Sequence, residues 1–265
     1  MRPIDTASLS ATERRIRLRE TALAALGGCT LAFAAAAASA AVQSATTSAA
    51  TPDSAPAIVE RMVAQNAARA EHLKYFTSRR HYHIEFHGLG RTMSADMHAQ
   101  VTYAAGAGKS FQVIDESGSR MLLNHVLLKL LETERDDSHQ QKTALTPSNY
   151  DFTLESETTE SGRPVYVFSV APKVKNKLLY RGKIWVDAQD YAVIRVEGQP
   201  AENPSFWIKS TEIHHIYAKN GEFWLPQSNR SESKVRFGGS AVLTIDYGTY
   251  QFEEPRNTAP DAASE

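Results

Sequence analysis

Short segments in which apolar and polar residues alternate fill most of this chain after residue 80. In residues 81–87, Tyr82, Ile84 and Phe86 face one way and the histidines the other, because successive side chains of a strand point to opposite sides. After residue 150, links as short as Asn220-Gly221 join such segments, and no crossover helix separates them. We therefore expect antiparallel strands at residues 81–87, 97–103, 111–114, 151–157, 165–170, 179–186, 191–197, 211–218, 222–225, 233–237 and 241–250.

Two segments carry a helical repeat instead. Residues 58–70 place apolar side chains at three- and four-residue spacing. Residues 121–137 (MLLNHVLLKLLETERDD) are apolar around most of the helix centre, which predicts cover on more than one side or an apolar cavity. The expected fold class is α+β and mainly antiparallel β: an open half-barrel of about 8–11 strands, with a few helices covering its concave face.

The N-terminus has the layout of an export signal. Five arginines within residues 1–20 precede the apolar residues 21–38, and Ala38-Ser39-Ala40 offers a small-x-small cleavage site. We expect residues 1–40 to be a signal peptide, 41–57 a flexible linker, 58–253 the folded domain and 254–265 a disordered tail. The expected location is the periplasm.

Three other interpretations of the N-terminus stay open. The apolar stretch is just long enough to remain as a membrane anchor across about 30 Å of hydrocarbon. Residues 26–29 (LGGC) resemble a lipobox, in which Cys29 would be acylated, and Arg14-Arg15 resembles a twin-arginine signal. Cys29 is the only cysteine, so cleavage after Ala40 would leave no thiol for a disulfide or a metal.

Charge and motifs argue against several classes of function. The chain has 29 Lys and Arg against 30 Asp and Glu, so no charge excess points to nucleic acid. Residues 106–110 (GAGKS) lack the upstream glycine and the following helix of a P-loop, and a hairpin turn is expected there. The sequence has no G-x-S-x-G nucleophile motif, and Asp187 and Asp190 are expected to form a turn. We expect no enzyme activity and no cofactor.

Histidines cluster on one side of the strand at residues 81–87. His81, His83 and His87 share that side with Glu85, and an H-x-H pair can chelate zinc. His98 and His125 could approach in three dimensions, but no further ligand is marked by the sequence. A solvated strand face is the favoured interpretation, and no metal site is expected.

Segment order and two long stretches resemble a known class of proteins. The stretches are residues 180–207 (YRGKIWVDAQDYAVIRVEGQPAENPSFW) and 223–250 (FWLPQSNRSESKVRFGGSAVLTIDYGTY), after an amphipathic helix, strands and a leucine-rich helix. The chain resembles the periplasmic outer-membrane lipoprotein-sorting proteins, the superfamily of the lipoprotein carrier and its receptor. That resemblance implies a half-barrel whose helices cover an apolar surface for acyl chains. It also implies an arginine that fastens the lid, for which Arg79, Arg80 and Arg91 are candidates.

These observations lead to one expected function and one alternative. The expected function is a non-enzymatic periplasmic carrier, monomeric, for lipoprotein acyl chains or lipid, with delivery or receptor partners in the inner or outer membrane. Large apolar residues on the strands either fill a core or line a cavity. The candidate lining consists of Phe86, Met97, Val101, Phe111, Leu127, Phe168, Trp185 and Trp207. The alternative is an envelope-stress sensor or protein-interaction module of the same fold.

Overall fold

A computed structural model describes residues 54–253, except 89, 136–139, 204 and 237. The expected signal peptide, residues 41–53 of the expected linker and the expected tail lie outside the described residues. Helix α2 (Ala55–His72) begins three residues before Ile58, so the last residues of the expected linker are helical. Pro56 suits this place, because the first helical turn does not need its missing N–H. No helix in the described part is both long and apolar enough to cross a membrane.

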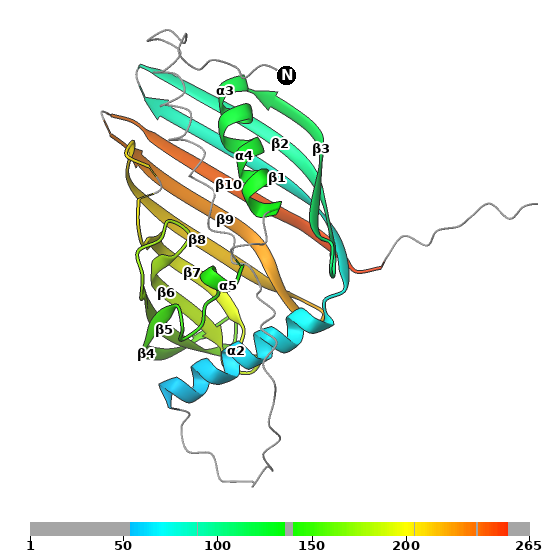
Figure 1. The fold of residues 1–265 in the computed structure, drawn as a ribbon, viewed down its shortest axis with the longest axis vertical. Coiled ribbons are helices and arrows are strands. Elements are labelled where there is room, and N and C mark those ends of the chain that lie inside the picture. The colour runs from blue at the N-terminus through cyan, green and yellow to red at the C-terminus, as the bar shows by residue number, and fades with distance from the viewer. Residues whose placement is uncertain (1–53, 89, 136–139, 204, 237, 254–265) are drawn as a thin grey trace, which may run out of the picture.

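Ten antiparallel strands form one sheet, in the order β3-β2-β1-β10-β9-β8-β7-β6-β5-β4 (Figure 1). The expected fold class, an open antiparallel half-barrel with few helices, is confirmed. The strands are β1 (Tyr75–Gly88), β2 (Arg91–Ala104), β3 (Gly108–Gly118), β4 (Tyr150–Glu160), β5 (Arg163–Pro172), β6 (Tyr180–Asp187), β7 (Val193–Pro200), β8 (Ile208–Asn220), β9 (Phe223–Val235) and β10 (Ser240–Gln251).

The connection between β3 and β4 joins the two ends of the sheet order. These strands are consecutive in the chain, so the segment between them must pass over one face of the sheet. That segment contains α3 (Arg120–Leu122), the π-helical turn η3 (Leu123–Leu127), α4 (Leu128–Arg135) and α5 (Gln140–Thr143). Figure 1 shows α3 and α4 lying in front of β1, β2 and β10. Topology therefore fixes the leucine-rich helix above the sheet.

One expected division between strands is wrong. The alternation predicts residues 222–225 and 233–237 as two separate strands. The structure joins most of both into the single strand β9. Pro226 pairs with Tyr217 where the register between β8 and β9 shifts, and a proline is tolerated at such a bulge. The expected turn at residues 106–108 is confirmed as the β2–β3 link.

Two apolar cores lie against the same face of the sheet. The first joins β1, β2 and β10 to α3, η3 and α4. The second joins the start of α2, through Ile58, Val59 and Met62, to β4, β5, β6 and β7. Each helix thus covers a different half of the sheet, with a strip of sheet left between them.

Candidate functional site

A row of paired residues shows which side chains share the covered face. Residues paired across antiparallel strands point the same way, so the strand register can be followed from β2 to β4. The row reads Met97, Tyr82, Ile245, Asn229, His215, Val196, Ile184, Phe168 and Leu154. We call this face of the sheet the inner face. It is apolar at both ends and polar in the middle.

The first apolar end is covered by the segment from Arg120 to Arg135, which we call the covering helix. Ile84, Met97 and Val101 of the sheet are all fully buried beneath it. The covering helix contributes a matching set of buried side chains: Leu122, Leu123, Val126, Leu127, Leu130 and Leu131. The sheet and the covering helix therefore present two apolar surfaces to each other.

The buried residues of the covering helix come as adjacent pairs every four residues. An α-helix repeats every 3.6 residues, so a four-residue repeat drifts away from the sheet in a regular helix. The π-helical turn Leu123–Leu127 takes more residues per turn and keeps the pairs in phase with the sheet. Such turns are frequent at functional sites. The four-residue spacing of the buried pairs and the π-helical turn thus both follow from packing the covering helix against the sheet.

A buried ion pair joins the covering helix to β1. Arg80 Nη1 donates to Glu134 Oε2 at 2.6 Å, and the two side chains are 3% and 1% exposed. Arg80 also lies 4.7 Å from the ring centroid of Tyr247 and 5.7 Å from that of Phe111. Burial opposes the charge of Arg80, but Glu134 and the nearby tyrosines outweigh it, and the pKa of Arg80 is raised. Arg80 therefore stays a cation inside the core.

A bulge places two tyrosines around this cation. Tyr247 and Tyr250 are three residues apart and would face opposite sides of a regular strand. The β1–β10 register shifts between Ser78 and Arg80, so that both tyrosines are buried on the inner face. Burial raises the pKa of both phenols, which keeps them neutral.

Hydrogen bonding around the ion pair is incomplete. Arg80 Nε, Glu134 Oε1 and the Tyr247 hydroxyl have no hydrogen-bond partner among the described residues. A buried polar atom without a partner costs free energy, so this arrangement is less stable than a fully satisfied one. The pair fixes the position of the covering helix, while its unsatisfied atoms reduce its net contribution to stability.

Polar side chains occupy the strip between the two cores. Thr211 and Ser233 share a hydrogen bond of 2.7 Å, and Ser231 donates to Asn229 at 3.3 Å. His215 is fully buried beside Asn229, and burial lowers its pKa to about 4. Its Nε2 has no hydrogen-bond partner among the described residues. The inner face therefore offers a neutral imidazole between two apolar surfaces.

The expected turn at Asp187 and Asp190 is confirmed. Asp187 Oδ1 accepts the backbone N–H groups of Gln189 at 3.0 Å and of Asp190 at 2.8 Å. Arg163 Nη2 donates to the same Asp187 oxygen at 2.8 Å, and Asp190 accepts from the Trp224 indole at 3.0 Å. Desolvation opposes ionisation of Asp187, but the hydrogen bond and charge of Arg163 and the two backbone N–H bonds together outweigh it, and the pKa of Asp187 is lowered. These carboxylates hold a structural turn.

The candidate lining residues do not all lie together. Phe86, Met97 and Val101 line the sheet side of the first core, and Leu127 belongs to the covering helix. Phe111 is half-buried and packs against the same core. Phe168 lies in the second core.

The two tryptophans of the candidate lining lie elsewhere. Trp185 packs with Val165 and Val167 on the opposite face of the sheet, where Arg195 lies 3.8 Å from its ring centroid. Strand alternation explains this, because its neighbours Ile184 and Val186 take the inner face. Trp207 is half-buried in the link before β8 and contacts the ring of Phe206. Neither tryptophan is part of the lining proposed below.

The sequence pattern does not single out Arg80 or its partner Glu134. Among Arg79, Arg80 and Arg91, only Arg80 is buried, since β1 alternation turns it inward. Glu134 follows Val126 and Leu130 at the same four-residue spacing. This spacing is the one feature of the sequence that indicates that Glu134 is buried.

Comparisons with known proteins found one family model and several solved structures at low identity. A model of a family of unknown function (DUF5686) matches residues 143–250, and no curated protein matches. A DUF1329 family protein from Desulfovibrio piger is 13% identical, with a TM-score of 0.38 over 75% of this chain and 92% of that one. A domain described as an outer membrane lipoprotein-sorting protein from Vibrio parahaemolyticus is 13% identical, with a TM-score of 0.37 over 74% and 92%. A LolA superfamily protein from Nitrosomonas europaea is 11% identical, with a TM-score of 0.33 over 76% and 94%.

Proposed function

We propose that this protein is a non-enzymatic carrier for a hydrophobic ligand in the periplasm, and that the covering helix is its lid. The observation that carries the proposal is the way the helix is held. It covers an apolar sheet surface, contains a π-helical turn and is joined to β1 by a buried ion pair with unsatisfied atoms. An acyl chain would take the place of the helix side chains on the inner face.

The covering helix and an acyl chain would gain comparable free energy from burial against the inner face. Burying an aliphatic side chain contributes about 1.5–3 kcal/mol, so the six buried side chains of the covering helix together contribute roughly 9–18 kcal/mol. An acyl chain of about sixteen carbons contributes roughly 13 kcal/mol, at about 0.8 kcal/mol per CH₂. Replacing the covering helix by an acyl chain on the inner face therefore changes the free energy only slightly. A carrier needs this, because it must release what it binds.

The proposed ligand is a lipoprotein acyl chain or a related lipid. Phe86, Met97 and Val101 would contact the chain, and Phe168 could extend the surface toward the second core. The polar strip around His215 and Asn229 would face ester or amide groups rather than the hydrocarbon. Delivery and receptor partners at the two membranes, and action as a monomer, are part of this proposal.

Lipid extracted from the protein purified from its own compartment tests the proposal. Mass spectrometry is expected to identify acyl-chain lipid, and a fluorescent fatty acid is expected to bind the delipidated protein. If neither lipid co-purifies nor the probe binds, the carrier function is wrong.

Two matched variants test the lid itself. Leu127→Ala removes a fully buried side chain from the covering helix, and Met97→Ala removes one from the sheet surface below it. Each leaves a cavity costing about 2–5 kcal/mol in the closed state. Leu127→Ala is expected to tighten probe binding by at least about tenfold, because it weakens only the competitor. Met97→Ala is expected not to tighten it, because it also removes ligand contact. Equal effects of the two variants would contradict the lid.

One observation favours the alternative of a protein-interaction module. End strand β3 exposes Val113 at 38% and Ile114 at 48%, and Ile114 lies at a register shift in the β2–β3 pairing. Exposed apolar residues on an edge strand suit a partner that adds a strand there. Stoichiometric capture of a protein that is lost in Ile114→Lys, with no lipid bound, would support this function in place of the carrier.

A further inference from the structure

The opposite face of β1, which we call the outer face, carries a cluster of histidines and carboxylates outside the proposed lipid site. Strand alternation turns His81 and His83 outward while Arg80 and Tyr82 face the core. In the register with β2, His83 lies opposite Asp96 and His81 lies opposite His98. Asp96 is therefore a direct neighbour of one histidine and a diagonal neighbour of the other.

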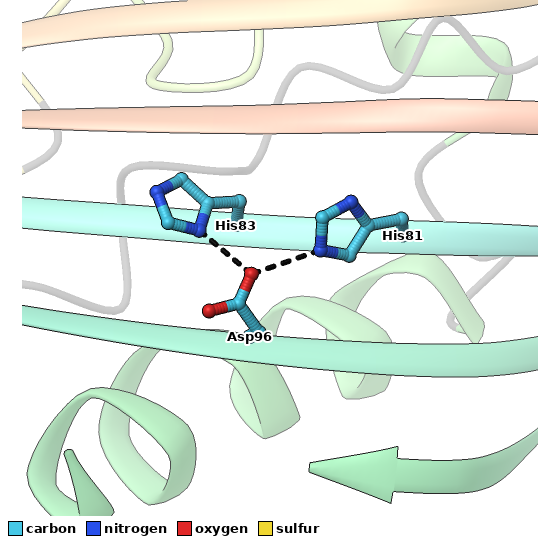
Figure 2. A group of neighbouring side chains, drawn as sticks. All are labelled: His81, His83 and Asp96. Carbon is cyan, nitrogen blue, oxygen red and sulfur yellow. Dashed lines mark hydrogen bonds and ion pairs between the residues drawn. The ribbon is translucent and has the colours of Figure 1, made fainter. Parts of the chain in front are cut away.

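Three side chains of this cluster converge on one point. His81 Nε2 lies 2.9 Å and His83 Nδ1 lies 2.7 Å from the same oxygen of Asp96. Figure 2 shows both rings directed from β1 toward the Asp96 carboxylate on β2. The three ligand atoms lie within 4.8 Å of one another, and each side chain is about one third exposed. Two imidazoles and one carboxylate thus leave the remaining directions open to water.

Both histidines have a second carboxylate at their other ring nitrogen. His83 Nε2 lies 3.4 Å from Glu85 Oε1, and His81 Nδ1 lies 4.0 Å from Asp246 Oδ2 on β10. Metal-binding histidines commonly direct their second nitrogen to a carboxylate, which sets the tautomer and makes the ligand nitrogen more basic. Glu85 already provides such a partner for His83, and Asp246 lies near the corresponding nitrogen of His81.

From this geometry we propose that the outer face of β1 and β2 binds one divalent transition-metal ion of the Zn²⁺ class. The ligands are His81 Nε2, His83 Nδ1 and an oxygen of Asp96, with water completing the shell. Two histidines with one carboxylate suit Zn²⁺, Cu²⁺ or Ni²⁺ better than the oxygen-binding Mg²⁺ or Ca²⁺. This site is independent of the proposed lipid carriage.

The adjustment required at Asp96 is small. Zinc–ligand distances of about 2.0–2.1 Å place tetrahedral ligands about 3.3 Å apart. The present contacts of 2.7 and 2.9 Å to Asp96 would therefore lengthen by about half an ångström. Partly exposed side chains can move that far by rotation, without a change in the strand register that aligns them.

Zinc binding to the untagged protein tests the proposal, in a Cys29→Ser background so that no thiol competes. Titration calorimetry with zinc alone is expected to show one ion per chain. The cobalt form is expected to show the visible absorption of a four- or five-coordinate ion. His83→Gln and Asp96→Asn are expected to weaken binding by more than about 100-fold, because changes to outer partners alone cost about 10–100-fold. Glu85→Gln is expected to fall in that lower range.

The control is His214→Gln, which alters an exposed histidine on β8. It is expected to bind zinc as tightly as the parent protein. Urea unfolding without metal checks that the ligand variants are folded. Absence of saturable zinc binding would overturn the proposal. So would parent-like affinity in folded His83→Gln and Asp96→Asn, or equal loss in His214→Gln.

Discussion

Replacing Arg80 by methionine is expected to lower the free energy of unfolding by about 3–5 kcal/mol. Methionine keeps most of the length of the side chain but removes the cation, so Glu134 is left as an unpaired carboxylate in the core. Urea unfolding at neutral pH measures the loss. The intact ion pair contributes only modestly to stability. The loss on mutation is large because the Glu134 carboxylate stays buried without a compensating charge.

Two controls separate this from a general effect of losing an arginine. Arg79→Met changes the exposed neighbour on β1 and is expected to shift stability by no more than about 0.5 kcal/mol. Arg80→Met combined with Glu134→Leu is expected to regain most of the loss, because apolar residues replace a buried pair at little cost. If Arg80→Met costs no more than Arg79→Met, the ion pair does not hold the covering helix.

Acidification is expected to remove about 3 kcal/mol of stability through His215 alone. Burial lowers the pKa of His215 to about 4, whereas in the unfolded chain it is about 6.5. Between these values the unfolded state binds more protons, so this contribution is complete above about pH 6.5 and is lost as pH falls to about 4. Each pKa unit between the folded and unfolded states changes the free energy of unfolding by about 1.4 kcal/mol.

The measurement is urea unfolding at several pH values between about 4 and 7. His215→Gln is expected to flatten the stability loss in this window, while His214→Gln on the exposed side of the same strand keeps it. Asp187 and Asp190 have lowered pKa values, so the stability that they contribute is lost only as pH falls below the usual pKa of an aspartate. The same slope in parent and His215→Gln would mean that His215 is not buried as a neutral ring.

Much of the fold could be predicted because local patterns fixed it. Alternation in residues 81–87 identified the inward and outward residues of β1, and short turns such as Asn220-Gly221 required antiparallel pairing. The leucine-rich helix had to be covered, and the structure covers it with the sheet. The expected break between residues 225 and 233 is absent, because a bulge between β8 and β9 accommodates Pro226 within one continuous strand.

The candidate sites could be predicted only in part, because they depend on register between strands far apart in sequence. Alternation placed His81 and His83 on one face, but only the pairing with β2 brings Asp96 between them. In the same way, β1 alternation turns Arg80 inward without naming Glu134 as its partner. Tyr247 and Tyr250 share a face only because of a bulge, which no period-two pattern predicts.

Hydrogen–deuterium exchange of the covering helix tests the central claim most directly. The amides from Leu122 to Arg135 are compared with those of β1 and β2, with and without a saturating fatty acid. If the helix is a lid displaced by ligand, its exchange is expected to become faster in the complex, while exchange in β1 and β2 stays slow. A fatty acid that binds while exchange of the covering helix stays unchanged or slows would contradict the account.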